Sequence, residues 1–95
     1  MEIRKTETFS RWIDCLKDPK ARAKVLVRIT RLAYGNPGDV KSVGKGVSEL
    51  RIPYGPGYRV YFIQRGTELT ILLAGGNKKT QSKDIQTAIK LATEL

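Results

Sequence analysis

The sequence predicts an α+β fold in which helices cover a small antiparallel sheet. Three strand-like segments follow one another closely in the second half of the chain, joined by connections of hairpin length. Two segments before them and one after them carry apolar residues at helical spacing. Since helices must cover the apolar face of such a sheet, the predicted order is β-α-α-β-β-β-α. The length of 95 residues suits a single domain over residues 1–95.

The N-terminal segment is expected to contain a short strand and a first helix. Residues 2–6 form the strand, and Thr6 or Thr8 is the N-cap of the helix, because a Thr hydroxyl accepts a hydrogen bond from the first turn. The helix presents one apolar face at spacing i, i+3, i+4 and i+7: Phe9, Trp12, Ile13 and Leu16.

A second helix is expected to begin at Asp18, a favoured N-cap residue followed by Pro19 at the first helical position. The Gly-Asn-Pro-Gly run at residues 35–38 ends it. Basic residues recur along one face at near-helical spacing: Lys20, Lys24, Arg28 and Arg31. Such a run is usually a solvated face, and contact with an acidic partner is the alternative.

The second half of the chain carries the predicted sheet. Residues 39–46 are expected to form a Gly- and Lys-rich loop, whose GKG lacks the spacing of a phosphate-binding P-loop. Strands are expected at residues 47–52, 58–64 and 69–74. A last helix begins near Ser82, with Asp84 in its first turn, and buries residues at helical spacing: Ile85, Ala88, Ile89 and Ala92.

Two arginines interrupt the apolar pattern of these strands. Because strand side chains alternate between faces, Leu50, Val60 and Phe62 are expected on the helix-covered face. The opposite face receives Glu49, Arg51, Arg59 and Tyr61. Adjacent strands bring such side chains within roughly 5–8 Å, so we expect a shared polar surface suited to phosphate binding. An internal ion pair between Glu49 and one arginine is the alternative.

The composition indicates an acidic partner and argues against metal chemistry. Eighteen Lys and Arg residues against nine Asp and Glu give a net charge of +9, which is typical of a nucleic-acid binder or of a protein with an acidic protein partner. Histidine is absent and Cys15 is the one cysteine, so we expect no metal, no other cofactor and no disulfide. No signal peptide or membrane span is evident, which predicts a cytoplasmic protein without membrane contact.

Two stretches resemble the RelE/ParE superfamily of bacterial toxins, and most closely its HigB-like addiction-module killer branch. They are ELRIPYGPGYRVYF at residues 49–62 and LLAGGNKKTQSKDIQTA at residues 72–88. The resemblance implies the α+β fold of that superfamily in a type II toxin–antitoxin system. RelE-like members cut mRNA on the ribosome, whereas ParE-like members poison DNA gyrase. Their partner is a co-encoded antitoxin, which for HigB-like toxins is generally a helix-turn-helix DNA-binding protein.

The resemblance also implies roles for single residues. Arg59 matches the arginine that contacts the scissile phosphate, Arg51 matches a basic residue on the preceding strand, and Lys78 matches one after the last strand. Glu49 stands where a second lysine is common, and Asp84 stands near an aromatic or acidic position of the final helix. The catalytic histidines of HigB-like toxins have no counterpart.

The predicted function is therefore a ribosome-dependent, metal-independent mRNA endonuclease that inhibits translation. Its nucleophile is the ribose 2′-OH, with Arg59 and Arg51 stabilising charge, Lys78 assisting, and Glu49 or Asp84 as the general base. The predicted RNA-binding residues are Tyr61, Lys79, Lys45 and Lys41. The alternatives are a ParE-like gyrase inhibitor that cuts no RNA and a non-catalytic basic binding module.

Overall fold

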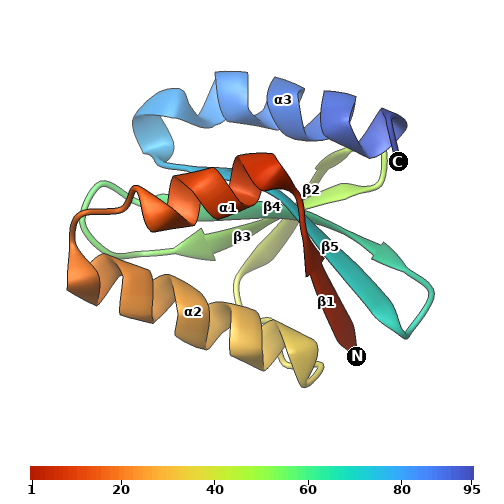
Figure 1. Cartoon of the computed structure of the whole chain (residues 1–95), viewed down its shortest axis with the longest axis horizontal. Coiled ribbons are helices and arrows are strands. Elements are labelled where there is room, and N and C mark those ends of the chain that lie inside the picture. Colours follow the sequence, from red (N-terminus) through yellow and green to blue (C-terminus); the bar gives the residue numbers. More distant parts are fainter.

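The computed structural model describes all residues 1–95 and contains a five-stranded sheet in the order β1-β5-β4-β3-β2 (Figure 1). The strands are β1 (Glu2–Lys5), β2 (Val40–Gly44), β3 (Val47–Ile52), β4 (Tyr58–Arg65) and β5 (Leu69–Gly76). The helices are α1 (Glu7–Asp14), α2 (Pro19–Ala33) and α3 (Gln81–Thr93), with a 3-10 turn η1 (Lys78–Thr80) before the last. The predicted α+β class is confirmed.

Both N-terminal helices begin where their capping residues predict. The Thr6 side chain accepts a hydrogen bond from the Phe9 amide at 3.1 Å, and it caps α1. The Asp18 side chain accepts from the Lys20 amide at 2.9 Å, with Pro19 in the first turn of α2. These side chains satisfy amide groups that have no partner within the helix.

Two features of the sheet differ from the prediction. The sheet is mixed, because β1 pairs in parallel with β5. The loop expected over residues 39–46 contains β2, which pairs antiparallel with β3. The glycines of this segment were interpreted as a loop signal, but they form the tight turn between β2 and β3. The turn residues Gly44, Lys45 and Gly46 have positive φ values of 102°, 55° and 79°.

Helices cover both faces of the sheet, so the expected polar face is wrong over most of its area. Phe62, Val60 and Leu50 pack with α1 and α2 in one apolar cluster, as the alternation predicts. Tyr61 and Ala88 belong to a second cluster between the sheet and α3. Figure 1 shows α3 along one side of the sheet and α1 with α2 on the other. The alternation correctly separates the two faces but does not show that α3 covers the second one.

A register shift in β5 enlarges the cluster beneath α3. Tyr61 pairs with Ala74 and Phe62 pairs with Leu72, so Leu73 has no direct partner on β4. Leu73 and Ala74 therefore both face α3 and are buried there. No helix in the chain has the length and apolar character that crossing a membrane requires.

Candidate phosphate-binding site

A cleft of about 370 Å³ opens where β3 ends and β4 begins. Four of its lining side chains are charged or aromatic: Asp39, Arg51, Tyr58 and Arg59. Ile52, Pro53 and Gly57 complete the wall. Arg51 and Arg59 are direct cross-strand partners in the sheet register, which explains why the two guanidinium groups reach one place.

The Arg59 side chain is held from two sides. Its Nη1 donates to the Gly57 carbonyl oxygen at 2.8 Å, and its Nε lies 3.5 Å from Glu49 Oε2. That second contact is an ion pair too long for a hydrogen bond, so the buried Nε has no hydrogen-bond partner. Nη2 makes no hydrogen bond within the chain and is not buried. With 12% of the side chain exposed, Arg59 can present Nη2 to an anion in the cleft.

Glu49 occupies the interior between the sheet and α3. Its side chain is 1% exposed, and Oε2 accepts hydrogen bonds from the Tyr61 hydroxyl at 3.1 Å and from Gln81 Nε2 at 2.8 Å. Glu49 does not line the cleft. Its predicted role as the general base therefore does not fit its position, and its geometry fits a group that orients Arg59.

Tyr61 is fully buried, so the prediction that it stacks on an RNA base is wrong for this conformation. Burial raises the pKa of its hydroxyl, and the neighbouring Glu49 carboxylate raises that pKa further. Tyr58, three residues earlier on β4, lines the cleft and is partly exposed. Its ring meets the Trp12 ring edge-on at 6.3 Å, which holds it in place.

Arg51 carries a counter-ion that sequence reasoning missed. Its Nη2 and Nε lie 3.0 and 3.3 Å from Asp39 Oδ1. The side chains are 39% and 53% exposed, so this pair is accessible from solvent. Asp39 reaches the site because its carbonyl oxygen accepts from the Arg51 amide at 3.0 Å, next to the unpredicted strand β2. Recognising that strand from the sequence would have placed Asp39 beside Arg51.

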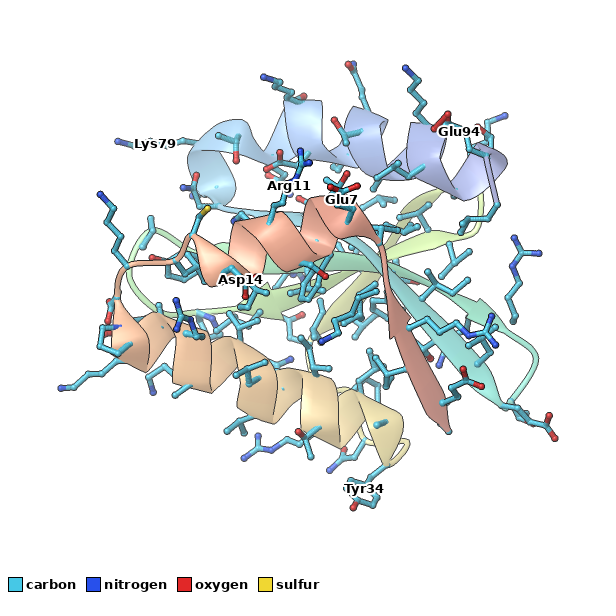
Figure 2. All side chains as sticks on the ribbon, viewed as in Figure 1. Glu7, Arg11, Asp14, Tyr34, Lys79 and Glu94 are labelled. Carbon is cyan, nitrogen blue, oxygen red and sulfur yellow. The ribbon has the colours of Figure 1, made fainter.

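Lys78 lies beside the β3–β4 loop but does not line the cleft. Its amide donates to the Pro56 carbonyl oxygen at 3.3 Å. A Cβ built on Gly57 would lie 3.6 Å from the Lys78 Cβ and 3.3 Å from Arg59 Nη1, so Gly57 is close to both residues. Lys79 is exposed on the same turn, and Figure 2 shows its side chain directed away from the molecule.

Asp84 lies beyond the cleft, against β5. Its Oδ2 accepts a hydrogen bond from the Thr80 hydroxyl, and a Cβ built on Gly76 would come within 1.7 Å of that oxygen. The absence of a side chain at Gly76 therefore allows the first turn of α3 to approach the strand. Asp84 does not line the cleft, so its predicted role as a base does not fit its position either.

The two lysines predicted from the 39–46 segment lie away from the cleft. Lys45 is in the β2–β3 turn, two residues before Val47, and Val47 precedes Arg51 by four strand residues. At about 3.3 Å per residue the two ends are roughly 13 Å apart. Lys41 lies opposite Glu49 in the β2–β3 register, halfway along β3, and its side chain is exposed. The structure thus gathers Arg51 and Arg59 in the cleft, places Lys78 next to its loop, and leaves Lys41 and Lys45 outside.

Comparison with known proteins identifies the family. A family model described as a phage-derived Gp49-like protein matches residues 11–95. An uncharacterised protein of Haemophilus influenzae is 52% identical over 95 residues, which is all of this chain and 96% of that protein. The match corrects the expected membership of the RelE/ParE superfamily and its HigB-like branch, since the family that the chain matches is the Gp49-like one.

Proposed function

The chain belongs to the family of phage-derived Gp49-like proteins, and from that basis we propose that it is a toxin that cleaves mRNA on the ribosome. The observation that supports the proposal most strongly is the meeting of Arg51 and Arg59 in one cleft, where Arg59 Nη2 has no hydrogen bond within the chain. Planar guanidinium groups suit phosphate recognition because their donors match the spacing of phosphate oxygens.

The proposed reaction uses the nucleophile that RNA itself carries. The ribose 2′-oxygen forms a bond to the adjacent phosphorus, and its proton passes to a base. The bond from phosphorus to the 5′-oxygen breaks, and that oxygen takes up a proton. The products are a 2′,3′-cyclic phosphate and a 5′-hydroxyl end. Arg59 and Arg51 stabilise the charge that grows on the phosphate oxygens, an effect worth about 10²–10³ in rate for one donor.

Asp39 is the carboxylate best placed to act as the base. It lines the cleft, whereas Glu49 and Asp84 do not. A phosphate that binds Arg51 competes with Asp39 for the same guanidinium, so substrate binding would release the Asp39 carboxylate to accept the 2′-OH proton. One general base contributes about 10²–10⁴-fold, which leaves positioning and charge stabilisation to supply the rest.

An inhibitor is part of the proposal, because a cell that makes such an enzyme must restrain it. The net charge of +9 favours an acidic antitoxin segment that covers the Arg51 and Arg59 cleft. Binding of such a segment would be fast and sensitive to salt.

One observation favours a second candidate function. The sole carboxylate in the cleft is paired with Arg51 in the free protein. A cleft that binds phosphates without a free base suits a non-catalytic toxin that holds DNA gyrase on DNA.

Brief expression in a bacterium separates the two candidates. We expect new mRNA 5′ ends within translated frames soon after induction, with no induction of a DNA-damage reporter. Induction of the reporter without new mRNA ends would replace the nuclease by the gyrase inhibitor.

A further inference from the structure

A second cleft, of about 340 Å³, lies between α2 and the β3–β4 loop. Ile52 and Pro53 line both this cleft and the phosphate-binding cleft. The two clefts are therefore neighbours that meet at these residues.

The wall of the second cleft formed by α2 is cationic. Lys24, Arg28 and Arg31 line it, and α2 contains no acidic residue between Pro19 and Ala33. Arg28 is already engaged, because its Nη1 donates to the Arg51 carbonyl oxygen at 2.7 Å and its Nη2 to the Pro37 carbonyl oxygen at 3.0 Å. Those bonds fix α2 against the end of β3, while Arg31 and Lys24 make no ion pair.

The opposite wall contains an aromatic ring that is held in place. The Tyr54 hydroxyl donates to Asp18 Oδ2 at 3.3 Å, and Lys24 Nζ lies 5.1 Å from the ring centroid. Pro53 and Ile52 provide apolar surface on the same wall as the ring, and Val27 adds apolar surface from α2. Cations that alternate with aromatic and apolar surface are what single-stranded nucleic acid binds, since bases stack while phosphates pair with the cations.

We propose that the second cleft binds the nucleotides that flank the cleaved phosphate of a single-stranded RNA, an inference that rests on the proposed function. Lys24 and Arg31 bind flanking phosphates, and a base packs against Tyr54. An acidic polypeptide would also match the charge. The shared wall at Ile52 and Pro53 favours RNA, because a substrate strand must leave the phosphate-binding cleft on at least one side.

Nuclear magnetic resonance titration with uncleavable 2′-O-methyl oligonucleotides tests the inference. A dinucleotide should shift only the amide signals of the phosphate-binding cleft and leave Tyr54 unmoved. The dinucleotide response is expected at residues that line this cleft: Arg51, Gly57, Tyr58 and Arg59. A hexanucleotide should also shift the signals of Tyr54 and of residues 23–31, and it should bind more tightly. The double variant K24Q/R31Q should reduce the salt dependence of hexanucleotide binding by about 1.4 in log–log slope, at about 0.7 per lost phosphate contact.

Matched variants distinguish RNA binding in the second cleft from non-specific electrostatic attraction to the basic protein. Y54L should weaken hexanucleotide binding at least about fivefold, the low end of base–aromatic stacking, and should leave dinucleotide binding unchanged. The control K83Q/K90Q removes the same charge from exposed positions of α3 and should leave the signals of residues 23–31 responsive. Thermal melting confirms that each variant is folded.

Three results would overturn the inference while leaving the proposed function in place. They are a hexanucleotide that binds no tighter than the dinucleotide, α2 signals that stay unmoved, and a control that weakens binding as much as K24Q/R31Q does. If a glutamate-rich peptide moves the α2 signals and the hexanucleotide does not, the cleft is a protein-docking site. If neither oligonucleotide shifts the signals of the phosphate-binding cleft, at Arg51, Gly57, Tyr58 and Arg59, the proposed function fails with the inference.

Discussion

Arg59 Nε lies 3.5 Å from Glu49 Oε2 in the interior between the sheet and α3. The carboxylate is held by Tyr61 and Gln81, and the guanidinium is held by the Gly57 carbonyl oxygen. The pair therefore connects the start of α3 to the cleft. A guanidinium that is fixed before the substrate binds stabilises charge on a phosphate more effectively, because it need not reorganise during the reaction.

The first prediction concerns the energetic coupling of this pair. R59L leaves the Glu49 carboxylate buried without its cation, and we expect a loss of about 3 kcal/mol in the free energy of unfolding. E49Q removes the uncompensated charge, so R59L/E49Q should lose less than the sum of the two single variants. Urea unfolding of all four proteins gives the coupling energy. If the losses in the two single variants add up to the loss in the double variant, the contact between Arg59 and Glu49 contributes nothing to stability.

The second prediction ranks the three candidate bases. D39N should slow single-turnover RNA cleavage by about 10²–10³-fold, within the range of one general base. E49Q and D84N should each cost less than about tenfold, because neither side chain lines the cleft. The pH–rate profile provides the control. A general base must be ionised to act, so the cleavage rate of the parent should fall at low pH, and this fall should be absent in the variant that has lost the base. An acidic limb that survives in D39N and vanishes in E49Q would make Glu49 the base.

The third prediction concerns alkaline stability. Burial, and then Glu49, raise the pKa of Tyr61 above its ordinary value of 10.0. Above pH 10 the unfolded chain therefore releases a proton that the folded chain keeps, and the free energy of unfolding falls as the pH rises. The slope from this one group reaches at most about 1.4 kcal/mol per pH unit.

Two conservative variants isolate that contribution. Y61F should flatten the alkaline decline, and at neutral pH it should cost about 1–3 kcal/mol because Glu49 loses a hydrogen-bond donor. Y34F is the matched control, because Tyr34 is 86% exposed and Figure 2 shows it projecting from the end of α2. Desolvation and Asp18 also raise the pKa of Tyr54, so Y61F should still show part of the alkaline decline in the free energy of unfolding. Equal declines in Y61F and the parent would contradict the assignment.

Local patterns in the sequence predicted much of the fold. The caps Thr6 and Asp18 were predicted correctly because each is decided by a few neighbouring residues. The strand Val47–Ile52 and the division of Leu50 and Tyr61 between two faces followed from alternation. These features depend on the side-chain period of a strand, which a sequence displays directly.

The errors concern contacts between distant segments. Alternation places Tyr61 and Glu49 on one face, yet only packing shows that α3 covers both. The bulge that turns Leu73 and Ala74 toward α3 depends on pairing with β4. Asp39 was missed for the same reason, because its role depends on a strand that glycines conceal. The candidate site was therefore predicted as a set of residues, of which the structure places Arg51 and Arg59 together in the cleft and Glu49, Tyr61 and Asp84 outside it.

The fourth prediction tests whether Asp84 is structural. G76A would place a Cβ 1.7 Å from Asp84 Oδ2 and 2.9 Å from the Thr80 hydroxyl, so the Asp84 side chain must move or α3 must shift. We expect a loss of about 1–3 kcal/mol, as for overpacked interiors. D84A should relieve most of this loss in the double variant, because the nearest atom belongs to that side chain. Chemical denaturation measures both effects, and a double variant as unstable as G76A would place the clash elsewhere.

Cleavage of a defined mRNA on programmed ribosomes tests the central claim most directly. The parent protein should cut within the codon held by the ribosome and leave 2′,3′-cyclic phosphate and 5′-hydroxyl ends. R51Q, whose side chain is partly exposed and contributes little to folding, should cut about 10²–10³-fold more slowly. The claim is contradicted if the parent leaves the mRNA intact while it stalls purified gyrase on DNA, or if R51Q cuts as fast as the parent.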